Sequence, residues 1–210
     1  MIETNSRFSV IMTVYDNGQE LEEHLPAFLT QDYAPGYEVI VVDESSTDHT
    51  EDILKLQKQQ YPQLYTTFLP KPDPHVTRRK LALTIGVKAA KHEWIVFTDI
   101  HAAPTSATWL SEIAEAIDSS TDILLGYFKK DQIRLQAYED IEQPRSLIRK
   151  AERLRADGHR GKHLKHLRGK YDFIVVRIEK AHDVLKFFEH KISLRRLLGL
   201  RLSVMYHNLT

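Results

Sequence analysis

Four short apolar runs mark the first 117 residues, and each is followed by a segment with helical spacing. The runs are Phe8–Val14, Tyr37–Val42, Leu64–Leu69 and Trp94–Thr98. The β-branched residues and the lack of polar alternation in the first, second and fourth runs are typical of strands buried on both faces, and Leu64–Leu69 indicates a weaker strand. Helices are expected from Gln19, over Glu51–Gln60, from Arg78 and over Thr105–Ile117. The alternation predicts an α/β fold whose sheet is mostly parallel and flanked by helices.

Three local signals refine this prediction. Pro26 lies inside the first helical pattern and predicts a kink there. Three prolines within residues 70–74 predict an extended loop. Asp48 precedes Glu51 by three residues, a spacing that predicts a reciprocal cap at the start of the second helix.

The pattern is looser in the second half of the chain. Thr121–Phe128 and Tyr171–Ile178 predict two further strands, and Pro144–Ala156 predicts a helix with one basic face. A basic loop, residues 159–170, separates that helix from the second strand. After Ala181, apolar and basic residues alternate in a way that fits an amphipathic helix on an anionic membrane surface. The same pattern fits a helix packed against the sheet with a solvated basic face.

Composition limits the class of protein. The 210 residues are enough for one sizeable core, or for one domain with an added lobe. The chain has no cysteine, which excludes disulfides and thiolate metal sites. Neither a secretion signal nor an apolar run of about 20 residues is found, so we expect a cytoplasmic protein.

The net charge of zero hides a strong asymmetry. Residues 1–144 hold 12 Lys and Arg against 23 Asp and Glu, a formal charge of −11. Residues 145–210 hold 17 against 6, a formal charge of +11. This distribution favours an anionic partner for the second part, such as a phosphate or a lipid headgroup. Attraction between the two oppositely charged parts is the alternative. A nucleic-acid partner is not favoured, because the tail lacks interleaved aromatic residues and any known motif.

Charged side chains follow several of the predicted strands. Asp43 and Glu44 stand at the end of one strand and Asp99 at the end of another, where open parallel sheets bind ligands. Asp99 could instead serve only as a turn or cap residue. Three cations, residues 78–80, open a helix, against the preference of the helix dipole for anions. They fit either a bound anion such as a diphosphate or a solvated basic turn.

Three segments resemble successive sequence blocks of one known family. They are FSVIMTVYDNG at residues 8–18, YEVIVVDESSTDHT at 37–50 and KLALTIGVKAAKHEWIVFTDIHAAP at 80–104. In this order and spacing they resemble the inverting family 2 glycosyltransferases of the GT-A fold. The resemblance covers roughly residues 7–127. It implies a Rossmann-like sheet, a nucleotide-sugar-binding half at 1–128, and a basic acceptor-side half with a C-terminal helix at 129–210.

The resemblance also implies roles for individual residues on the donor side. Thr13 and Tyr15 match positions that line the nucleotide base. Asp43 and Glu44 match an acidic pair whose second member binds the uracil edge, so a UDP-linked donor is expected. The contacts with the diphosphate fall to Arg78 and Lys80, which lie near the matching basic positions of the family.

The metal site departs from the pattern of the family. Asp99 matches the first acid of the DxD motif, near the ribose and the metal, and His101 occupies the place of the second acid. That acid normally holds the Mn²⁺ or Mg²⁺ that neutralises the diphosphate leaving group. A neutral histidine nitrogen binds Mn²⁺ but suits Mg²⁺ poorly. The resemblance thus implies Asp99 and His101 as metal ligands, and the alternative is that His101 is a loop residue in a site that no longer binds metal.

The general base is the second departure. Family members carry an acid in the acceptor half, often in a Glu-Asp pair, that activates the acceptor hydroxyl. No such pair follows the strand Tyr171–Ile178, and Asp183 and Glu189 are the acids that we assign to this role. Glu139-Asp140 is a Glu-Asp pair but precedes that strand.

The sequence thus predicts a hexosyltransferase-type enzyme for polysaccharide or glycolipid synthesis. It would take a nucleotide-sugar donor and a glycan or lipid-phosphate acceptor, and its basic part could touch the inner face of a membrane. The alternative is a degenerate GT-A-like protein that binds a nucleotide-sugar, or a partner protein, without transfer. His101 and the missing Glu-Asp pair favour that alternative.

Overall fold

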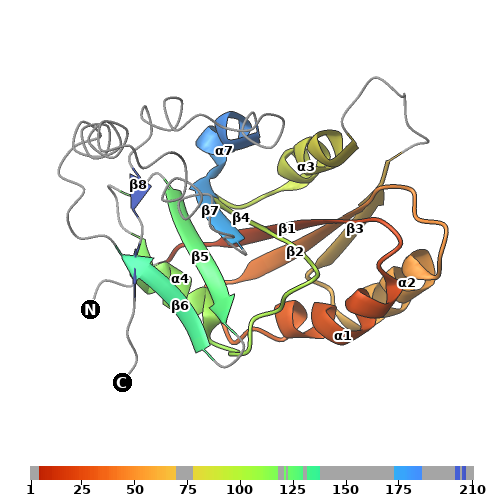
Figure 1. The fold of residues 1–210 in the computed structure, drawn as a ribbon, viewed down its shortest axis with the longest axis horizontal. Coiled ribbons are helices and arrows are strands. Elements are labelled where there is room, and N and C mark those ends of the chain that lie inside the picture. Colours follow the sequence, from red (N-terminus) through yellow and green to blue (C-terminus); the bar gives the residue numbers. More distant parts are fainter. Residues whose placement is uncertain are drawn as a thin grey trace, which may run out of the picture.

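A mixed sheet lies at the centre of the molecule, with helices on both faces (Figure 1). The computed structural model describes residues 5–69, 78–117, 121, 123–129, 132–137, 173–185, 202–203 and 205–206. The strands are β1 (Phe8–Val14), β2 (Tyr37–Asp43), β3 (Leu64–Phe68), β4 (Trp94–Thr98), β5 (Ile123–Lys129), β6 (Gln132–Ala137), β7 (Phe173–Arg177), β8 (Leu202–Ser203) and β9 (Met205–Tyr206). The helices are α1 (Gly18–Leu29), α2 (Thr50–Gln60), α3 (Arg78–Ala89), α4 (Trp109–Ala116) and α7 (Ile178–Leu185).

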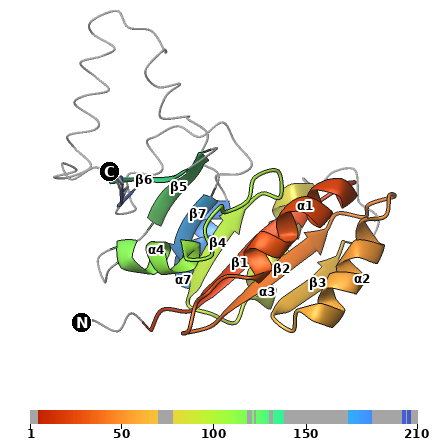
Figure 2. The ribbon, with the colours of Figure 1, turned by 90° about the horizontal axis from the view of Figure 1, so that it is seen from below.

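The first four strands form a parallel block in the order β3-β2-β1-β4. Each connection between them contains a helix, as parallel pairing requires. Beyond β4 the sheet becomes antiparallel, because β7 pairs with β4 on one side and with β5 on the other. β6 then pairs antiparallel with β5. Figure 2 shows β7 seated between β4 and β5, so a strand that is late in the sequence completes the sheet beside an early one.

Two hydrophobic cores cover the two faces of this sheet. Alternate β1 residues point to opposite sides, so Val10 and Met12 join α1, α2 and α4 in one core. Ile11 joins α3 and α7 in the other. Figure 1 shows this division, with α3 and α7 above the sheet and α1 and α2 below it. Because both faces are covered, β1, β2 and β4 are buried and mostly apolar, whereas the edge strand β3 keeps exposed positions.

The predicted strands β1 and β4 have the bounds found in the structure, and β2, β3, β5 and β7 agree to within two residues. α1 continues through Pro26, and Thr30 N donates a hydrogen bond to Pro26 O at 3.0 Å. α4 begins at Trp109 and not at Thr105. The carbonyls of Ser106 and Ala107 accept hydrogen bonds from the end of α1, from Gln31 Nε2 and Asp32 N, and so are bonded outside the helix.

Several predicted segments lie outside the described residues. These are the proline-rich loop 70–74, the helix Pro144–Ala156, the basic loop 159–170 and the tail beyond residue 185 apart from β8 and β9. β6 was not predicted from the sequence. Its six residues, QIRLQA, alternate apolar and polar side chains over too short a span to stand out.

Gly126 of β5 packs tightly against β7 within the antiparallel part of the sheet. It lies opposite Phe173 of β7, whose ring stacks edge-on with Trp109 at 5.1 Å between centroids. A Cβ at residue 126 would lie 1.9 Å from Phe173 Cζ. We predict that Gly126→Ala lowers the free energy of unfolding by about 1–3 kcal/mol, measured by denaturant titration, because the ring has no room to move.

A second substitution checks the cause of that loss. In the double variant Gly126→Ala/Phe173→Leu, the smaller leucine side chain replaces the ring and makes room for the new methyl group. The double variant should therefore lose less stability than the two single variants together. Additive losses would show that the Phe173 ring is not the obstacle.

Candidate functional site

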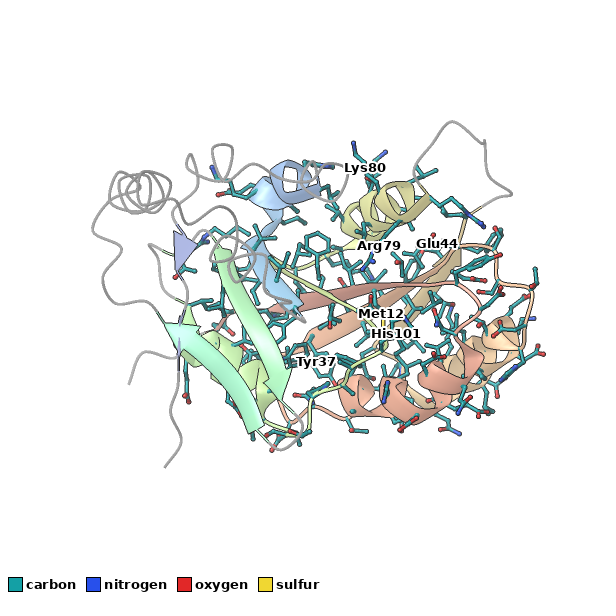
Figure 3. All side chains as sticks on the ribbon, viewed as in Figure 1. Met12, Tyr37, Glu44, Arg79, Lys80 and His101 are labelled. Atoms are coloured by element: carbon teal, nitrogen blue, oxygen red, sulfur yellow. The ribbon has the colours of Figure 1, made fainter. Side chains whose placement is uncertain are left out.

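The candidate site lies where the carboxyl ends of β1, β2 and β4 meet. Val14, the last residue of β1, is paired with Asp43, the last of β2, and Glu44 N donates to Val14 O at 2.8 Å. On the other side of β1, Ile11 pairs with Phe97 near the end of β4. The loops that follow these three strands therefore leave the sheet together. Figure 3 shows Glu44, Arg79 and His101 gathered around this edge.

The loop after β1 and the loop after β2 are locked to each other. Asp16 Oδ1 accepts a hydrogen bond from Thr47 N at 2.6 Å, and Asp16 N donates to Ser46 Oγ at 2.9 Å. Gly18 N, at the start of α1, donates to Asp48 Oδ2 at 2.9 Å. These polar groups satisfy backbone donors that would otherwise lie open at the ends of the elements. The lock fixes the distance between the residues that follow the two strands.

Two residues of these loops adopt left-handed backbone conformations. Asp16 has φ of 51° and Ser45 has φ of 67°. This region is uncommon for residues other than glycine, and such residues concentrate at functional sites. Ser45 is held in place by its hydroxyl, which donates to Leu69 O at 2.6 Å. The local strain is thus maintained by specific contacts at the edge where the strands end.

Asp48 does not form the reciprocal cap that the sequence predicts. Its Oδ1 accepts from Thr50 N at 3.0 Å while its Oδ2 binds α1, and Glu51 pairs with Lys55 at 2.8 Å. Burial pushes the pKa of Asp48 upward, but hydrogen bonds from Thr50 and from the Gly18 amide outweigh it, so the pKa lies below the ordinary aspartate value. Asp48 therefore ties α1 to α2 across the lock.

Tyr15 and Arg78 form a stacked pair beside the strand ends. The Arg78 guanidinium lies 4.8 Å from the centroid of the Tyr15 ring, and its Nη2 donates to Glu44 O. Tyr15 is 46% exposed, so the ring remains accessible. Thr13, half-buried, lies two residues earlier and pairs with Val42. Arg78 thus contacts both sequence-predicted base-binding segments and is held by them.

Asp43 has one carboxylate oxygen engaged and the other not bonded within the described residues. Oδ1 accepts from both Ser46 N at 2.9 Å and Ser46 Oγ at 2.6 Å. These bonds hold the carboxylate in one orientation, and the residue is only 9% exposed. A carboxylate that is already fixed in this way can accept a further hydrogen bond from a ligand with little additional loss of side-chain entropy.

Asp99 pairs with Arg79, a residue to which the sequence alone gave no individual role. Arg79 Nη2 lies 3.1 Å from Asp99 Oδ2. Arg79 lies in the first turn of α3 and reaches Asp99 with its side chain 54% exposed. Figure 3 shows Lys80 on the outer side of the same helix. Of the three consecutive cations, Arg78 and Arg79 therefore reach the strand ends, and the helical rotation decides which.

His101 lies between two carboxylates that come from different elements. Its Nε2 is 3.6 Å from Asp99 Oδ1, and its Nδ1 is 3.6 Å from Glu20 Oε1 of α1. The backbone N–H of His101 donates to Asp99 Oδ1 at 3.1 Å. Ile100, which lies between Asp99 and His101 in the sequence, is fully buried. Its carbonyl accepts a hydrogen bond from His24 Nδ1 at 2.6 Å. Residues 99–101 are therefore held in a defined position above α1.

The donor set at this point fits a divalent cation in part. Two metal–ligand bonds of about 2.1 Å each can span the 3.6 Å between Asp99 Oδ1 and His101 Nε2. No three His, Asp or Glu side chains of the described segments converge as a complete metal-binding group. A cation here would draw its remaining ligands from water and from a bound phosphate, as Mg²⁺ and similar ions commonly do.

The two acids expected to supply the general base are not placed at the site by the structure. Asp183 lies in α7, and its side chain is outside the described part of the chain, as is Glu189. The Glu139-Asp140 pair is outside it as well. Their assignment stays a prediction. No helix within the described residues is long and apolar enough to cross a membrane.

Most of the chain matches the profile of a known family. The profile of "Glycosyl transferase family 2" matches residues 9–165. The "Uncharacterized glycosyltransferase YibD" of Escherichia coli (strain K12) is 23% identical over 99 residues, which are 47% of this chain and 27% of YibD. The likeness to YibD therefore spans about a quarter of that relative.

Two solved structures resemble the fold. Mannosyltransferase PcManGT from Pyrobaculum calidifontis, in complex with GDP-Man and Mn²⁺, is 26% identical with a TM-score of 0.51, covering 60% of this chain and 36% of that one. S. aureus TarS 1-349 is 20% identical with a TM-score of 0.59, covering 91% of this chain and 53% of that one. At 20% identity the likeness to TarS shows the fold alone.

The lock between the two loops predicts a pH dependence of stability. Because the pKa of Asp48 is lower in the folded chain, its carboxylate stabilises the fold at neutral pH and the contribution is lost as pH falls through its folded pKa. Asp48→Asn should lower the free energy of unfolding by about 1 kcal/mol at pH 7, measured by denaturant titration. The difference from the parent should shrink in strongly acidic buffer.

Asp52→Asn is the matched control, because Asp52 is an exposed acid in the first turn of the same helix. Asp52→Asn should lower the free energy of unfolding less than Asp48→Asn does, and this loss of stability should depend less on pH. Equal effects of the two substitutions would mean that helix-terminal charge, and not the lock, is what Asp48 contributes.

Proposed function

Because the chain belongs to glycosyltransferase family 2, we propose that it binds a nucleotide-sugar at the strand ends described above and transfers the sugar with inversion to a glycan or lipid-linked acceptor. The observation that carries this proposal is the meeting of Tyr15, Asp43 and Asp99 at one sheet edge, beneath the two arginines that open α3. Carboxyl ends of parallel strands are where open α/β sheets bind ligands.

The family resemblance and the α/β fold predicted from the sequence are both confirmed. The family profile covers residues 9–165, and the sheet with helices on both faces is the expected architecture. The likeness to TarS 1-349 extends over most of the chain and supports the same fold.

The base of the donor would stack on Tyr15. One face of the ring is covered by the Arg78 guanidinium, which keeps the ring in place and leaves it 46% exposed. Thr13 would line the same region, and Asp43 and Glu44 would accept hydrogen bonds from the base edge. These acids support a UDP-linked donor. A GDP-linked donor is the second candidate, since the PcManGT structure was solved with GDP-Man.

The diphosphate would lie between the first turn of α3 and the end of β4. Arg79 supplies a guanidinium at this place and is already ordered by Asp99. A planar guanidinium suits phosphate oxygens, and fixed charges of this kind stabilise the negative charge that develops on a leaving diphosphate. Lys80, predicted from the sequence for the same role, would add only longer-range attraction, because it points away from the sheet in Figure 3.

A divalent cation, Mn²⁺ in preference to Mg²⁺, would be held by Asp99 and His101. When bound, it would neutralise the diphosphate leaving group. Asp99 Oδ2 remains paired with Arg79, so the carboxylate would serve the cation through Oδ1 and the arginine through Oδ2.

The acceptor would approach from the basic part of the chain. Residues 145–210 carry 17 Lys and Arg against 6 Asp and Glu, which supports an acceptor that bears phosphate, in polysaccharide or glycolipid synthesis. Contact with an anionic membrane surface follows from the same charge. The division into a donor half, 1–128, and an acceptor half, 129–210, is part of this proposal. Asp183 and Glu189 are the acids proposed as general base.

Binding without transfer is the alternative function. His101 replaces the second acid of the DxD motif, and no Glu-Asp pair follows β7. Tight nucleotide binding with no turnover of any donor, in the presence of Mn²⁺ and a panel of phosphorylated acceptors, would select this alternative.

Tyr15→Leu tests the proposed base site. Loss of stacking should weaken the binding of UDP or GDP by about tenfold, measured by calorimetric titration. The chain offers a matched control in Tyr65, which is 42% exposed and also lies beneath a cation, with Lys58 Nζ 5.8 Å from its ring centroid. Tyr65→Leu should leave nucleotide affinity unchanged. Equal effects of the two variants would contradict the placement of the base.

Asp99→Ala tests the transfer activity. The substitution removes the group that orders Arg79 and the carboxylate proposed to serve the cation. The rate of donor hydrolysis or transfer, measured as release of nucleoside diphosphate, should fall by about a hundredfold or more. The exposed Asp52→Asn variant serves as control. Full activity of Asp99→Ala would exclude this edge of the sheet as the reaction site.

A further inference from the structure

We propose that Glu20, in the first turn of α1, positions His101 as a metal ligand and supplies the negative charge that the histidine lacks. The inference rests on the proposed function, because it concerns the cation of the same donor site. It adds a residue from a different element, 79 positions from Asp99 in the sequence, to which the sequence gave no role.

The geometry that carries the proposal is a row of three side chains. Glu20 Oε1 lies 3.6 Å from Nδ1 of His101, and Asp99 Oδ1 lies 3.6 Å from Nε2. The two ring nitrogens thus face two different carboxylates. A histidine that binds a metal through one ring nitrogen almost always donates the N–H of the other to a carboxylate, a carbonyl or water. Glu20 stands where that acceptor is required.

The neighbouring contacts decide which nitrogen faces the cation. Ile100 is fully buried and its carbonyl is bonded by His24 of α1, so the backbone beside His101 is held against that helix. Arg79 takes Oδ2 of Asp99, which leaves Oδ1 as the oxygen on the histidine side. Nε2 is therefore the metal-facing nitrogen and Nδ1 the one that carries the proton toward Glu20.

Charge explains why a carboxylate is needed there. Two acids of a DxD motif bring two negative charges to the cation, whereas Asp99 and a neutral imidazole bring one. Glu20 restores the second charge from behind the imidazole and raises the basicity of the ligating nitrogen. An imidazole ligand also favours Mn²⁺ over Mg²⁺, because Mg²⁺ prefers oxygen ligands.

An acid in the first turn of a helix has a structural explanation as well. Glu20 interacts favourably with the helix dipole, and this alone would account for its residue type. The dipole explanation predicts an effect on stability and none on metal binding. Glu22, an exposed acid on the same helix, provides the matched control because no contact of its side chain within the described residues involves His101.

The experiment measures Mn²⁺ binding to the full chain by electron paramagnetic resonance, in parallel series with GDP and with UDP. Glu20→Gln should weaken Mn²⁺ binding by about tenfold or more, and Glu22→Gln should leave it unchanged. Pulsed spectra of bound Mn²⁺ should show coupling to an imidazole nitrogen in the parent, and His101→Asp should remove this coupling while Mn²⁺ still binds. In the His101→Asp background, Glu20→Gln should no longer weaken binding, because Glu20 acts through the imidazole.

Each of the following results would overturn the inference. Equal Mn²⁺ affinity in Glu20→Gln and Glu22→Gln would make Glu20 a dipole partner only. The same loss from Glu20→Gln in the parent and in the His101→Asp background would mean that Glu20 does not act through the histidine. Absence of nitrogen coupling in the parent would show that His101 does not bind the metal.

If GDP and UDP bind tightly without Mn²⁺ and Mn²⁺ never binds, this inference fails while donor binding stands. If neither nucleotide binds under any condition, the proposed function fails with it.

Discussion

The register of β1 between β2 and β4 is the constraint on which the site depends. Val14 faces Asp43 on one side, and Ile11 faces Phe97 on the other. A slip of one residue would turn every β1 side chain to the opposite core, so the two hydrophobic clusters fix the register strongly. The three strand ends are thereby held at one edge. Everything proposed about ligand binding follows from this arrangement of backbone.

Acidic side chains at that edge bind either backbone amides or an arginine. Asp16 and Asp48 are engaged with backbone amides of the two loops, so they stabilise the scaffold. Asp99 and Arg79 pair across β4 and α3, and both keep substantial exposure. An exposed ion pair such as Asp99–Arg79 can be reorganised at small cost when a ligand binds, whereas breaking the hydrogen bonds of Asp16 and Asp48 would separate the two loops. The acids that follow the strands are thus of two kinds.

The sequence predicted β1, β2 and β4 well because burial on both faces leaves these strands mostly apolar. It also identified Asp43, Glu44 and Asp99 correctly as strand-end residues. It did not distinguish the three cations that open α3, because only the rotation of the helix against the sheet turns Arg79, and not Lys80, toward Asp99. Glu20 was missed for a similar reason. Its meeting with His101 joins residues 81 positions apart, and no local pattern encodes such a contact.

The proposed nucleotide site lies where the loops after β1, β2 and β4 meet. Hydrogen–deuterium exchange of the full chain, with and without UDP or GDP in the presence of Mn²⁺, tests it most directly. A nucleotide bound there should slow exchange in residues 15–18, 44–48 and 99–101, while β3 and the end of α2 stay unaffected. Slower exchange confined to other segments, with these three loops unchanged, would contradict it.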